Sequence, residues 1–335
     1  MKKINYPEYF IFELSSNCNF WCKMCYNSRK SWMENIWKQL NFDSQIKVLD
    51  IIWKFWKTIV FTWWEPTLNK NIYELINHAK SLWLNIILIT NWSTLDKWKI
   101  SLLQNKWVSK IQLSFHSRDE KIFDEITWTK NYYSIIKWNI INSLKIFWSD
   151  NVFINIVPNK YPFDNVINTC TELSKIWIKN ITVWIPVYSW SAKNNWILFS
   201  RKEILKIYEL LCKLNEKLKI NITLWTSLPQ CLFFWKSLKN SLVKLSSWCS
   251  IWKNAIAIWF DWGIKPCVEF NKSIGNILND SFEDIRYWED LNRFRNNYYV
   301  PEICKSCKSL RKCRWWCRIS AFHYSWSYNW RDPYM

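Results

Sequence analysis

The chain has 335 residues and a formal net charge of +19, and 50% of its residues are hydrophobic. This length exceeds one average domain, so we expect two. No run of 18 uncharged apolar residues occurs, which excludes a transmembrane helix, and no apolar stretch of signal-peptide length precedes the first polar cluster. We therefore expect a cytoplasmic protein with no membrane partner. Its basic residues are spread evenly, which argues against nucleic-acid binding and leaves an acidic peptide or protein substrate compatible.

Residues 8–190 alternate between strand-like runs and amphipathic segments of helical length. The strand-like runs are Tyr9–Leu14, Thr58–Thr62, Asn85–Thr90, Lys110–Ser114, Val152–Val157 and Asn180–Ile185. Six strands with helices between them indicate parallel βαβ units with right-handed crossovers. We predict an α/β fold, a partial (β/α)6 TIM-like barrel, with its site at the carboxyl ends of the strands.

The chain changes character after the sixth strand. Residues 187–199 are polar and without apolar periodicity, and residues 200–218 form one amphipathic helix. From about 225 onward short strands, turns and cysteines prevail, which is typical of a domain held together by metal. We predict a barrel domain at 1–195, a linker with the connecting helix at 196–224, and a small cysteine-rich domain at 225–335.

Tryptophan occurs where glycine is expected. The chain has 29 Trp and 2 Gly, against about 23 glycines at average usage. Asn91-Trp92 and Asp261-Trp262 stand where turns favour Asn-Gly and Asp-Gly. Five more tryptophans follow helix-like runs: Trp56, Trp83, Trp107, Trp148 and Trp177. At this position after a helix the chain often turns left-handed, and glycine is preferred there because it has no Cβ.

We infer from this placement that most of these tryptophans are glycines in the source organism. The route would be a UGA codon decoded there as glycine and translated here as tryptophan. The alternative is a genuinely tryptophan-rich protein, which explains the number of tryptophans but not their positions.

The twelve cysteines are clustered, and in a reducing compartment clustering indicates metal binding rather than disulfides. Cys18, Cys22 and Cys25 lie within eight residues, in the loop after the first strand. Three thiolates can cover one face of a metal centre. A structural zinc ion would need a fourth ligand, whereas a [4Fe–4S] cluster with three ligands keeps one iron open for catalysis.

Polar residues also follow the next strands. The second strand leads into Thr62-Trp63-Trp64-Glu65-Pro66, which becomes Thr-Gly-Gly-Glu-Pro when glycine is restored. Two glycines let backbone groups approach a ligand closely, whereas two indoles would fill that space. His116, just past the fourth strand, is a weak catalytic candidate, because a lone histidine is more often structural.

The Cys-x3-Cys-x2-Cys loop followed by Gly-Gly-Glu-Pro resembles the radical S-adenosylmethionine (SAM) enzymes, and the resemblance covers nearly the whole chain. It implies that Cys18, Cys22 and Cys25 hold a [4Fe–4S] cluster whose open iron chelates the methionyl group of SAM. Met24 departs from the family, which usually has an aromatic residue before the third cysteine. The resemblance assigns the methionyl site to Trp63, Trp64, Glu65 and Pro66. It matches Asn91 to the Asn of the family's Thr-Asn-Gly. Ser114 and Asn155 are weaker candidates for contacting the adenosyl part.

The C-terminal third resembles the SPASM domain, which binds auxiliary [4Fe–4S] clusters. The pattern is Cys249-x12-Trp262-x4-Cys267 followed by Cys304-x2-Cys307-x5-Cys313-x3-Cys317, with Trp262 taken as glycine. The resemblance assigns one cluster to Cys249, Cys267 and Cys317, with Cys231 as a further candidate. It assigns the other cluster to Cys304, Cys307 and Cys313.

The last cysteine of this pattern is missing, and Met335 occupies about its place. A thioether is a poor substitute for thiolate on iron. The second cluster then has an open iron or is labile, or the chain is truncated. The alternative is a zinc knuckle built from Cys304, Cys307, Cys313 and Cys317.

The resemblance implies an oxidoreductase that reductively cleaves SAM to a 5′-deoxyadenosyl radical, which abstracts hydrogen from the substrate. We expect that substrate to be a peptide or protein side chain, as for a peptide maturase or a sulfatase maturase. The reducing electron donor would be a protein such as flavodoxin or ferredoxin. Two other classes stay open: a zinc-stabilised non-catalytic binding protein, and a tryptophan-rich basic protein that stacks on single-stranded nucleic acid.

Overall fold

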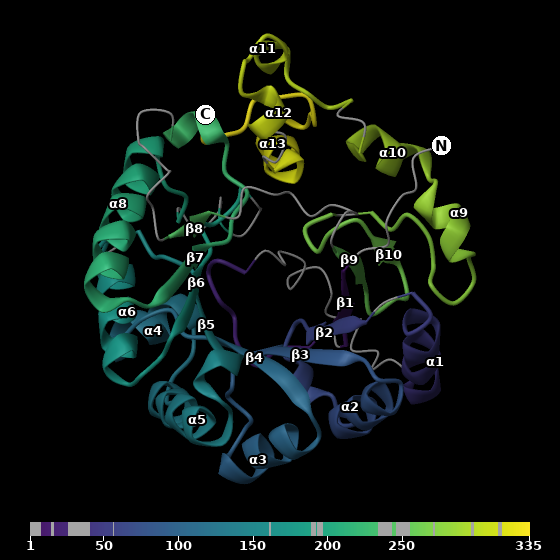
Figure 1. Ribbon diagram of the computed structural model, residues 1–335, viewed down its shortest axis with the longest axis vertical. Coiled ribbons are helices and arrows are strands. Elements are labelled where there is room, and N and C mark those ends of the chain that lie inside the picture. Colours follow the sequence, from purple (N-terminus) through teal and green to yellow (C-terminus); the bar gives the residue numbers. More distant parts are fainter. Residues whose placement is uncertain are drawn as a thin grey trace.

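The computed structural model describes most of the chain, and one curved sheet dominates it. The described residues are 8–14, 17–25, 41–55, 57–160, 162–188, 192, 197–233, 243–245, 255–270, 272–295, 298–313 and 317–335. The sheet curls into an open barrel whose helices lie on its outer side, and the C-terminal helices lie across the open side (Figure 1). Its strand order is β10-β9-β1-β2-β3-β4-β5-β6-β7-β8.

All six predicted strands are present and pair in parallel, so the predicted partial barrel is confirmed. β2 and β3 have the predicted bounds, whereas β4 begins earlier, at Val108. The strands are β1 (Tyr9–Glu13), β2 (Thr58–Thr62), β3 (Asn85–Thr90), β4 (Val108–Ser114), β5 (Val152–Ile156) and β6 (Asn180–Val183).

Four short strands extend this sheet at its two edges. β7 (Asn221–Leu224) pairs with β6, and β8 (Lys244–Leu245) pairs with β7. At the other edge β9 (Ala255–Ile258) runs parallel to β1, and β10 (Ile264–Lys265) is antiparallel to β9. The cysteine-rich region therefore contributes strands to the sheet of the barrel, and the domain limits at 195 and 225 stay predictions.

The helices follow the strands as the βαβ pattern predicts. The connecting helix α8 begins with a capping box, in which the Ser200 side chain accepts from the Glu203 N–H and the Glu203 carboxylate accepts from the Ser200 N–H. No helix in the described residues is long and apolar enough to cross a membrane. The helices of the barrel are α1 (Phe42–Ile52), α2 (Ile72–Ser81), α3 (Lys97–Asn105), α4 (Glu120–Thr127), α5 (Tyr133–Ile146), α6 (Asn165–Lys175) and α8 (Arg201–Leu218).

Short helices complete the described chain. Three are 3-10 turns: η2 (Pro66–Leu68), η3 (Ser149–Asn151) and η4 (Gln230–Phe233). The C-terminal helices are α9 (Phe282–Arg286), α10 (Glu289–Arg295), α11 (Glu302–Lys305), α12 (Leu310–Cys313) and α13 (Arg318–Ser325).

The two faces of the sheet differ in burial. Side chains that point to the helices, such as Phe12 on β1 and Ile154 on β5, are completely buried. Their neighbours on the inner face, such as Ile11, Gln112 and Asn155, are only partly buried. Because successive strand residues alternate between the faces, the inner face along β4 and β5 is less buried than the face that points to the helices.

Left-handed backbone is concentrated at tryptophans. Of the ten positive-φ non-glycine residues that are described, eight are Trp63, Trp83, Trp92, Trp107, Trp128, Trp177, Trp262 and Trp326. The predicted left-handed conformation is thus confirmed at five expected sites: Trp83, Trp92, Trp107, Trp177 and Trp262. It is wrong at Trp148, whose φ of −59° and ψ of 136° lead the chain into η3 rather than directly into a strand. Trp56 lies outside the described residues.

Two exposed tryptophans test whether the backbone itself demands glycine. Trp177 is 82% exposed with φ of 68°, whereas Trp148 is 81% exposed with φ of −59°. Trp177→Gly should raise the free energy of unfolding by about 1 kcal/mol, because a left-handed conformation is costly for residues with a Cβ. Trp148→Gly should lower it by a few tenths of a kcal/mol, roughly, through unfolded-chain entropy. Urea unfolding followed by circular dichroism measures both, and equal effects of the two substitutions would contradict the prediction.

Candidate active site

The three cysteines of the N-terminal motif lie in the loop that follows β1. All three are partly exposed, and Cys18 and Cys22 pack against the main hydrophobic core. The backbone N–H of Phe20 donates to Cys18 Sγ at 3.4 Å, and Asn91 Nδ2 lies 3.8 Å from the same sulfur. Such N–H donors stabilise a thiolate that carries an iron–sulfur cluster. The donor set therefore fits the implied cluster.

This cysteine loop is tied to two neighbouring parts of the barrel. The Lys23 N–H donates to the Ile126 carbonyl near the end of α4 at 2.8 Å. The Glu65 N–H, just after β2, donates to the Asn17 carbonyl at 3.1 Å. The loop is thus held at the carboxyl edge of the sheet. No three His, Cys, Asp or Glu side chains among the described residues are close enough to hold one metal ion, and the assignment of the three cysteines as cluster ligands stays a prediction.

Glu65 joins the ends of β2 and β3 through its carboxylate. It accepts hydrogen bonds from Thr67 Oγ1 at 2.6 Å, from Thr90 Oγ1 at 2.5 Å and from the Asn91 N–H at 2.6 Å. Complete burial raises the pKa of Glu65, and the hydrogen bonds from Thr67, Thr90 and Asn91 oppose that rise. Glu65 therefore fixes Asn91, whose amide faces Cys18.

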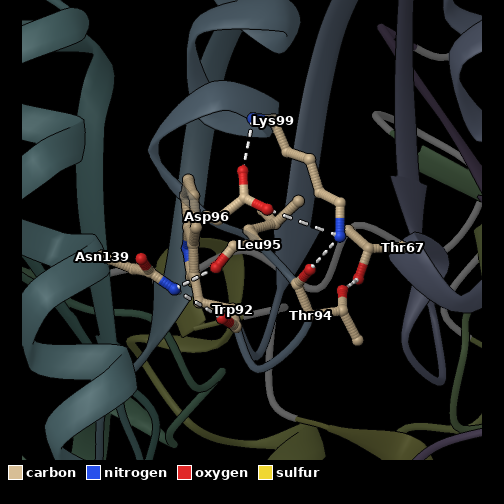
Figure 2. A network of polar contacts seen from close by, with 7 residues as sticks. All are labelled: Thr67, Trp92, Thr94, Leu95, Asp96, Lys99 and Asn139. Carbon is tan, nitrogen blue, oxygen red and sulfur yellow. Dashed lines mark hydrogen bonds and ion pairs between the residues drawn. The ribbon is translucent and has the colours of Figure 1, made fainter.

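The turn after β3 is fixed from two further sides, as Figure 2 shows. Asn139 Nδ2, on α5, donates to the carbonyls of Trp92 at 3.1 Å and Leu95 at 2.5 Å. Thr94 Oγ1 hydrogen-bonds with Thr67 Oγ1, which follows β2. The segment after β3 is thereby linked to both the helix layer and the neighbouring strand end.

Indoles occupy the place where the methionyl group of SAM is expected. Trp63 is buried with φ of 53°, and its ring lies 6.2 Å from that of Trp259. Trp64 packs against the same core. Trp92 is completely buried with φ of 62°, and its indole N–H has no hydrogen-bond partner among the described residues, an omission that typically costs about 1–3 kcal/mol. With tryptophan at these positions, the carboxyl edge of β2 and β3 does not leave room for a bound sulfonium ligand.

Ser114 and Asn155 are brought together on the inner face of the barrel. They are register partners on β4 and β5. Asn155 Oδ1 is buried and lacks a hydrogen-bond partner in the described chain. The register continues from Asn155 to Thr182 on β6 and Thr223 on β7. Sequence reasoning missed these threonines, which the parallel register of the strands could have revealed.

A buried charged cluster that the motifs did not signal lies where β9 and β10 join β1. Both carboxylate oxygens of Glu13 are buried without a hydrogen-bond partner among the described residues. The register Lys265–Ala257–Ile11 places Lys265 on the same inner face. Burial raises the pKa of Glu13, and the charge of Lys265 opposes it. Burial likewise raises the pKa of Glu269 to about 8.

His116 is held as a neutral, buried ring. The Val157 N–H donates to His116 Nδ1 at 3.1 Å, so the neutral ring carries its proton on Nε2. Asn165 Nδ2 donates to the His116 carbonyl at 2.9 Å. Burial lowers the pKa of His116 to about 4. These contacts give the histidine a structural task, and its catalytic role stays a prediction.

The structure separates the C-terminal cysteines into two groups. Cys267 and Cys317 pack against the main core, whereas Cys304 and Cys313 form a separate buried cluster. The assignment of these cysteines to two auxiliary clusters stays a prediction. Cys249 lies outside the described residues.

Comparison with known proteins shows the family to which the chain belongs. The chain matches the Radical SAM superfamily over residues 12–186 and the SPASM iron–sulfur cluster-binding domain over residues 249–308. Since the first match covers more than half of the chain, the protein belongs to the radical SAM superfamily. It is a radical SAM enzyme of the SPASM subgroup, whose cofactors are a [4Fe–4S] cluster, SAM and auxiliary iron–sulfur clusters. This excludes the non-catalytic alternatives.

Individual relatives cover nearly all of the chain. It is 23% identical over 334 residues to the PqqA peptide cyclase of Bradyrhizobium diazoefficiens, covering 94% of this chain and 82% of that protein. SuiB of Streptococcus suis superposes with a TM-score of 0.74 at 14% identity, covering 98% of this chain and 77% of SuiB. The enzyme anSMEcpe with bound AdoMet and Cp18Cys peptide gives a TM-score of 0.69 at 18% identity, covering 93% and 89%. The two structural likenesses establish the fold.

Buried His116 should make stability sensitive to mild acid. Its folded pKa of about 4 lies below its ordinary value of 6.5. The unfolded state therefore binds the proton first, and stability falls as the pH drops below about 6.5. In His116→Asn the Oδ1 atom can still accept from the Val157 N–H, but no proton is taken up. Between pH 7.5 and 5.5 the original chain should lose about 1 kcal/mol more unfolding free energy than this variant.

Urea unfolding at the two pH values measures this difference. His78→Asn is a suitable control, because His78 is partly exposed and bound to Asp50 at 2.7 Å on the outer helices. A pH dependence that is the same in the original chain and in His116→Asn would contradict the structural account of His116.

Proposed function

We propose that this enzyme abstracts hydrogen from a side chain of a peptide or protein, in the manner of a peptide maturase or a sulfatase maturase. The observation that carries the proposal is the row of polar side chains, Ser114, Asn155, Thr182 and Thr223, that the strand register aligns on the inner face of the barrel. Support comes from relatives whose names state a peptide: the PqqA peptide cyclase, SuiB bound to precursor peptide SuiA, and anSMEcpe with Cp18Cys peptide.

The cysteine loop would hold the catalytic cluster through Cys18, Cys22 and Cys25. When bound, this cluster supplies the electron that cleaves the sulfonium of SAM to give a 5′-deoxyadenosyl radical. The Phe20 N–H and the Asn91 amide stabilise the charge on the Cys18 sulfur. The buried carboxylate of Glu65 holds the backbone N–H of Asn91, and the side-chain Nδ2 of Asn91 donates to Asn19 Oδ1 at 3.0 Å, so the orientation of this amide is fixed before the cofactor binds.

The inner face would hold the adenosyl part and the substrate. Asn155 Oδ1 offers a buried acceptor that no described group uses, so it suits a hydroxyl or amine donor of a ligand. Ser114 lies beside it in the register. Thr182 and Thr223 extend the polar row toward β7. A row of neutral polar side chains orients a ligand and shields a reactive species from water.

The inner face is large enough for this task only if the edge carries small residues. We propose glycine at Trp63 and Trp64, where the methionyl group would approach the backbone. Trp259 follows β9 and lies beside Trp63, and the rings of Trp184 and Trp225, after β6 and β7, lie 6.1 Å apart. All five side chains stand at the carboxyl edge of the sheet, where ligands bind in such folds.

A set of glycine substitutions at this edge tests the function. Trp63, Trp64, Trp92, Trp184, Trp225 and Trp259 are replaced together by glycine, and iron and sulfide are loaded anaerobically. With dithionite and SAM, this chain should form 5′-deoxyadenosine, measured by liquid chromatography and mass spectrometry, and the original chain should form none. The control replaces three tryptophans at outer helix ends, Trp83, Trp107 and Trp177, which should leave cofactor cleavage absent. Cleavage by the original chain, or equal cleavage by the control, would contradict the proposal.

The substrate class needs a separate measurement. Short reading frames next to the gene are expressed together with the glycine-restored enzyme, with flavodoxin or ferredoxin as electron donor. A mass change in one encoded peptide, absent when Cys18, Cys22 and Cys25 are replaced by alanine, supports peptide modification. Cofactor cleavage with no mass change in any of these peptides would count against it.

A further inference from the structure

A buried carboxylate at the end of β1 lacks a hydrogen-bond partner in the part of the chain that the structure describes. Glu13 is the last residue of β1 and is 1% exposed. Neither of its carboxylate oxygens accepts a hydrogen bond from a described residue. A carboxylate loses its hydration on burial, and folded proteins nearly always replace the lost water by hydrogen-bond donors. A buried carboxylate without such donors is a candidate for binding a ligand.

The alternation of side chains along β1 places this carboxylate on the inner face of the sheet. Phe10 and Phe12 are completely buried on the face that points to the helices, so Ile11 and Glu13 point to the other face. β1 lies between β9 and β2 (Figure 1). Glu13 is the register partner of Thr62, the last residue of β2. It therefore lies at the carboxyl edge of the sheet, where ligands bind in such folds.

Two of the edge tryptophans stand directly beside this carboxylate. Trp63 follows the register partner of Glu13 on β2. On the other side, the register of β9 with β1 brings Trp259, the residue after Ile258, level with Glu13. The two indole rings lie 6.2 Å apart. With glycine at both positions, the carboxylate of Glu13 would face open space inside the barrel.

Lys265 is the competing partner of this carboxylate within the chain. It lies on the same face of the sheet, across β9 from β1. Burial raises the pKa of Glu13, and the charge of Lys265 opposes that rise. The ammonium of Lys265, however, lies over the ring of Trp259. The charges of Asp261 and Glu269 act on the pKa of Glu13 in the same direction as burial, so this part of the sheet has more carboxylates than ammonium groups.

We propose that Glu13 binds a cationic side chain of the peptide substrate, a lysine ammonium or an arginine guanidinium, inside the barrel. Hydrogen bonds between a carboxylate and a charged donor are about twice as strong as those between neutral groups. The cation would supply the donors that the described chain does not give to Glu13. This inference rests on the proposed function, because it names the substrate class for the same barrel.

The direct test measures binding in the absence of SAM, iron and reductant. The full chain with the six edge tryptophans replaced by glycine is titrated with the methylamides of N-acetyl-lysine, N-acetyl-arginine and N-acetyl-norleucine, and NMR gives the dissociation constants. At least one cationic probe should bind about tenfold more tightly than the norleucine probe, which has the alkyl chain of lysine without its charge. The lysine and arginine probes show which cation is preferred.

Variants of the same chain assign the preference to one carboxylate. Glu13→Gln should remove the preference for a cationic probe, because the amide keeps the size of the side chain without its charge. Glu172→Gln is the matched control and should keep the preference, because Glu172 lies on the outer helix α6, where it pairs with Lys137 and Lys175. Equal binding of the cationic and norleucine probes, or a preference that survives in Glu13→Gln, would overturn the proposal.

A measurement on the original chain keeps the proposal open to contradiction if the glycine-restored chain does not fold. Glu13→Gln and Lys265→Met are compared singly and together by urea unfolding. If the carboxylate serves a ligand, Glu13→Gln should change the unfolding equilibrium constant by no more than about threefold, and the effects of the two substitutions should add. A tenfold or greater rise in that constant, lost when Lys265 is also replaced, would show a structural ion pair and overturn the proposal. No readout involves SAM or iron, so absence of cofactor cleavage would contradict only the proposed function.

Discussion

The carboxyl edge of the parallel sheet must turn left-handed in several places, and the rest of the site depends on this constraint. The chain leaves β2 at Trp63 with φ of 53° and passes the turn after β3 at Trp92 with φ of 62°. Between these turns, Glu65 connects the two strand ends and holds Asn91 against the cysteine loop. A residue without a Cβ satisfies such a backbone at no steric cost and leaves room beside it. A tryptophan at such a position has a strained left-handed backbone, and its indole fills the space beside the backbone.

This constraint links the strain of the fold to the chemistry of the site. The tryptophans at outer helix ends, such as Trp83 and Trp177, are exposed, so glycine there would relieve backbone strain without opening a cavity. The tryptophans at the strand ends, such as Trp63 and Trp259, are buried against each other. Glycine at Trp63, whose φ is 53°, would relieve backbone strain and also leave room beside the backbone, whereas glycine at Trp259 would only leave room. Glycine in place of these tryptophans would account both for the left-handed backbone at several positions of the barrel and for the occluded cofactor edge.

Local patterns predicted much of the fold. β2 and β3 are apolar runs bounded by polar residues, and the capping box of Ser200 and Glu203 marks the start of α8. Strands as short as β8 and β10 give no periodic signal, so their place in the sheet could not be predicted. Trp148 was missed because the residues after α5 form η3 before the next strand begins.

Some residues of the candidate site could be predicted from the sequence and others could not. The cysteine spacing and the Trp-Trp-Glu-Pro turn give a recognisable sequence signal because the residues of each motif are close neighbours in the chain. Thr182, Thr223 and Glu13 do not, because the face that a strand residue occupies depends on register between distant segments. The same holds for Gln230, whose backbone N–H donates to Cys313 Sγ across 83 residues of sequence.

The most direct measurement is the mass of one peptide from the protein purified from its source organism. Trypsin releases Thr58–Lys70, which contains both residues of the turn after β2. The account predicts a peptide with glycine at positions 63 and 64, as its fragment-ion series would show. A peptide with two indoles at these positions would contradict it, because the left-handed turn and the cofactor edge would then have to accommodate tryptophan.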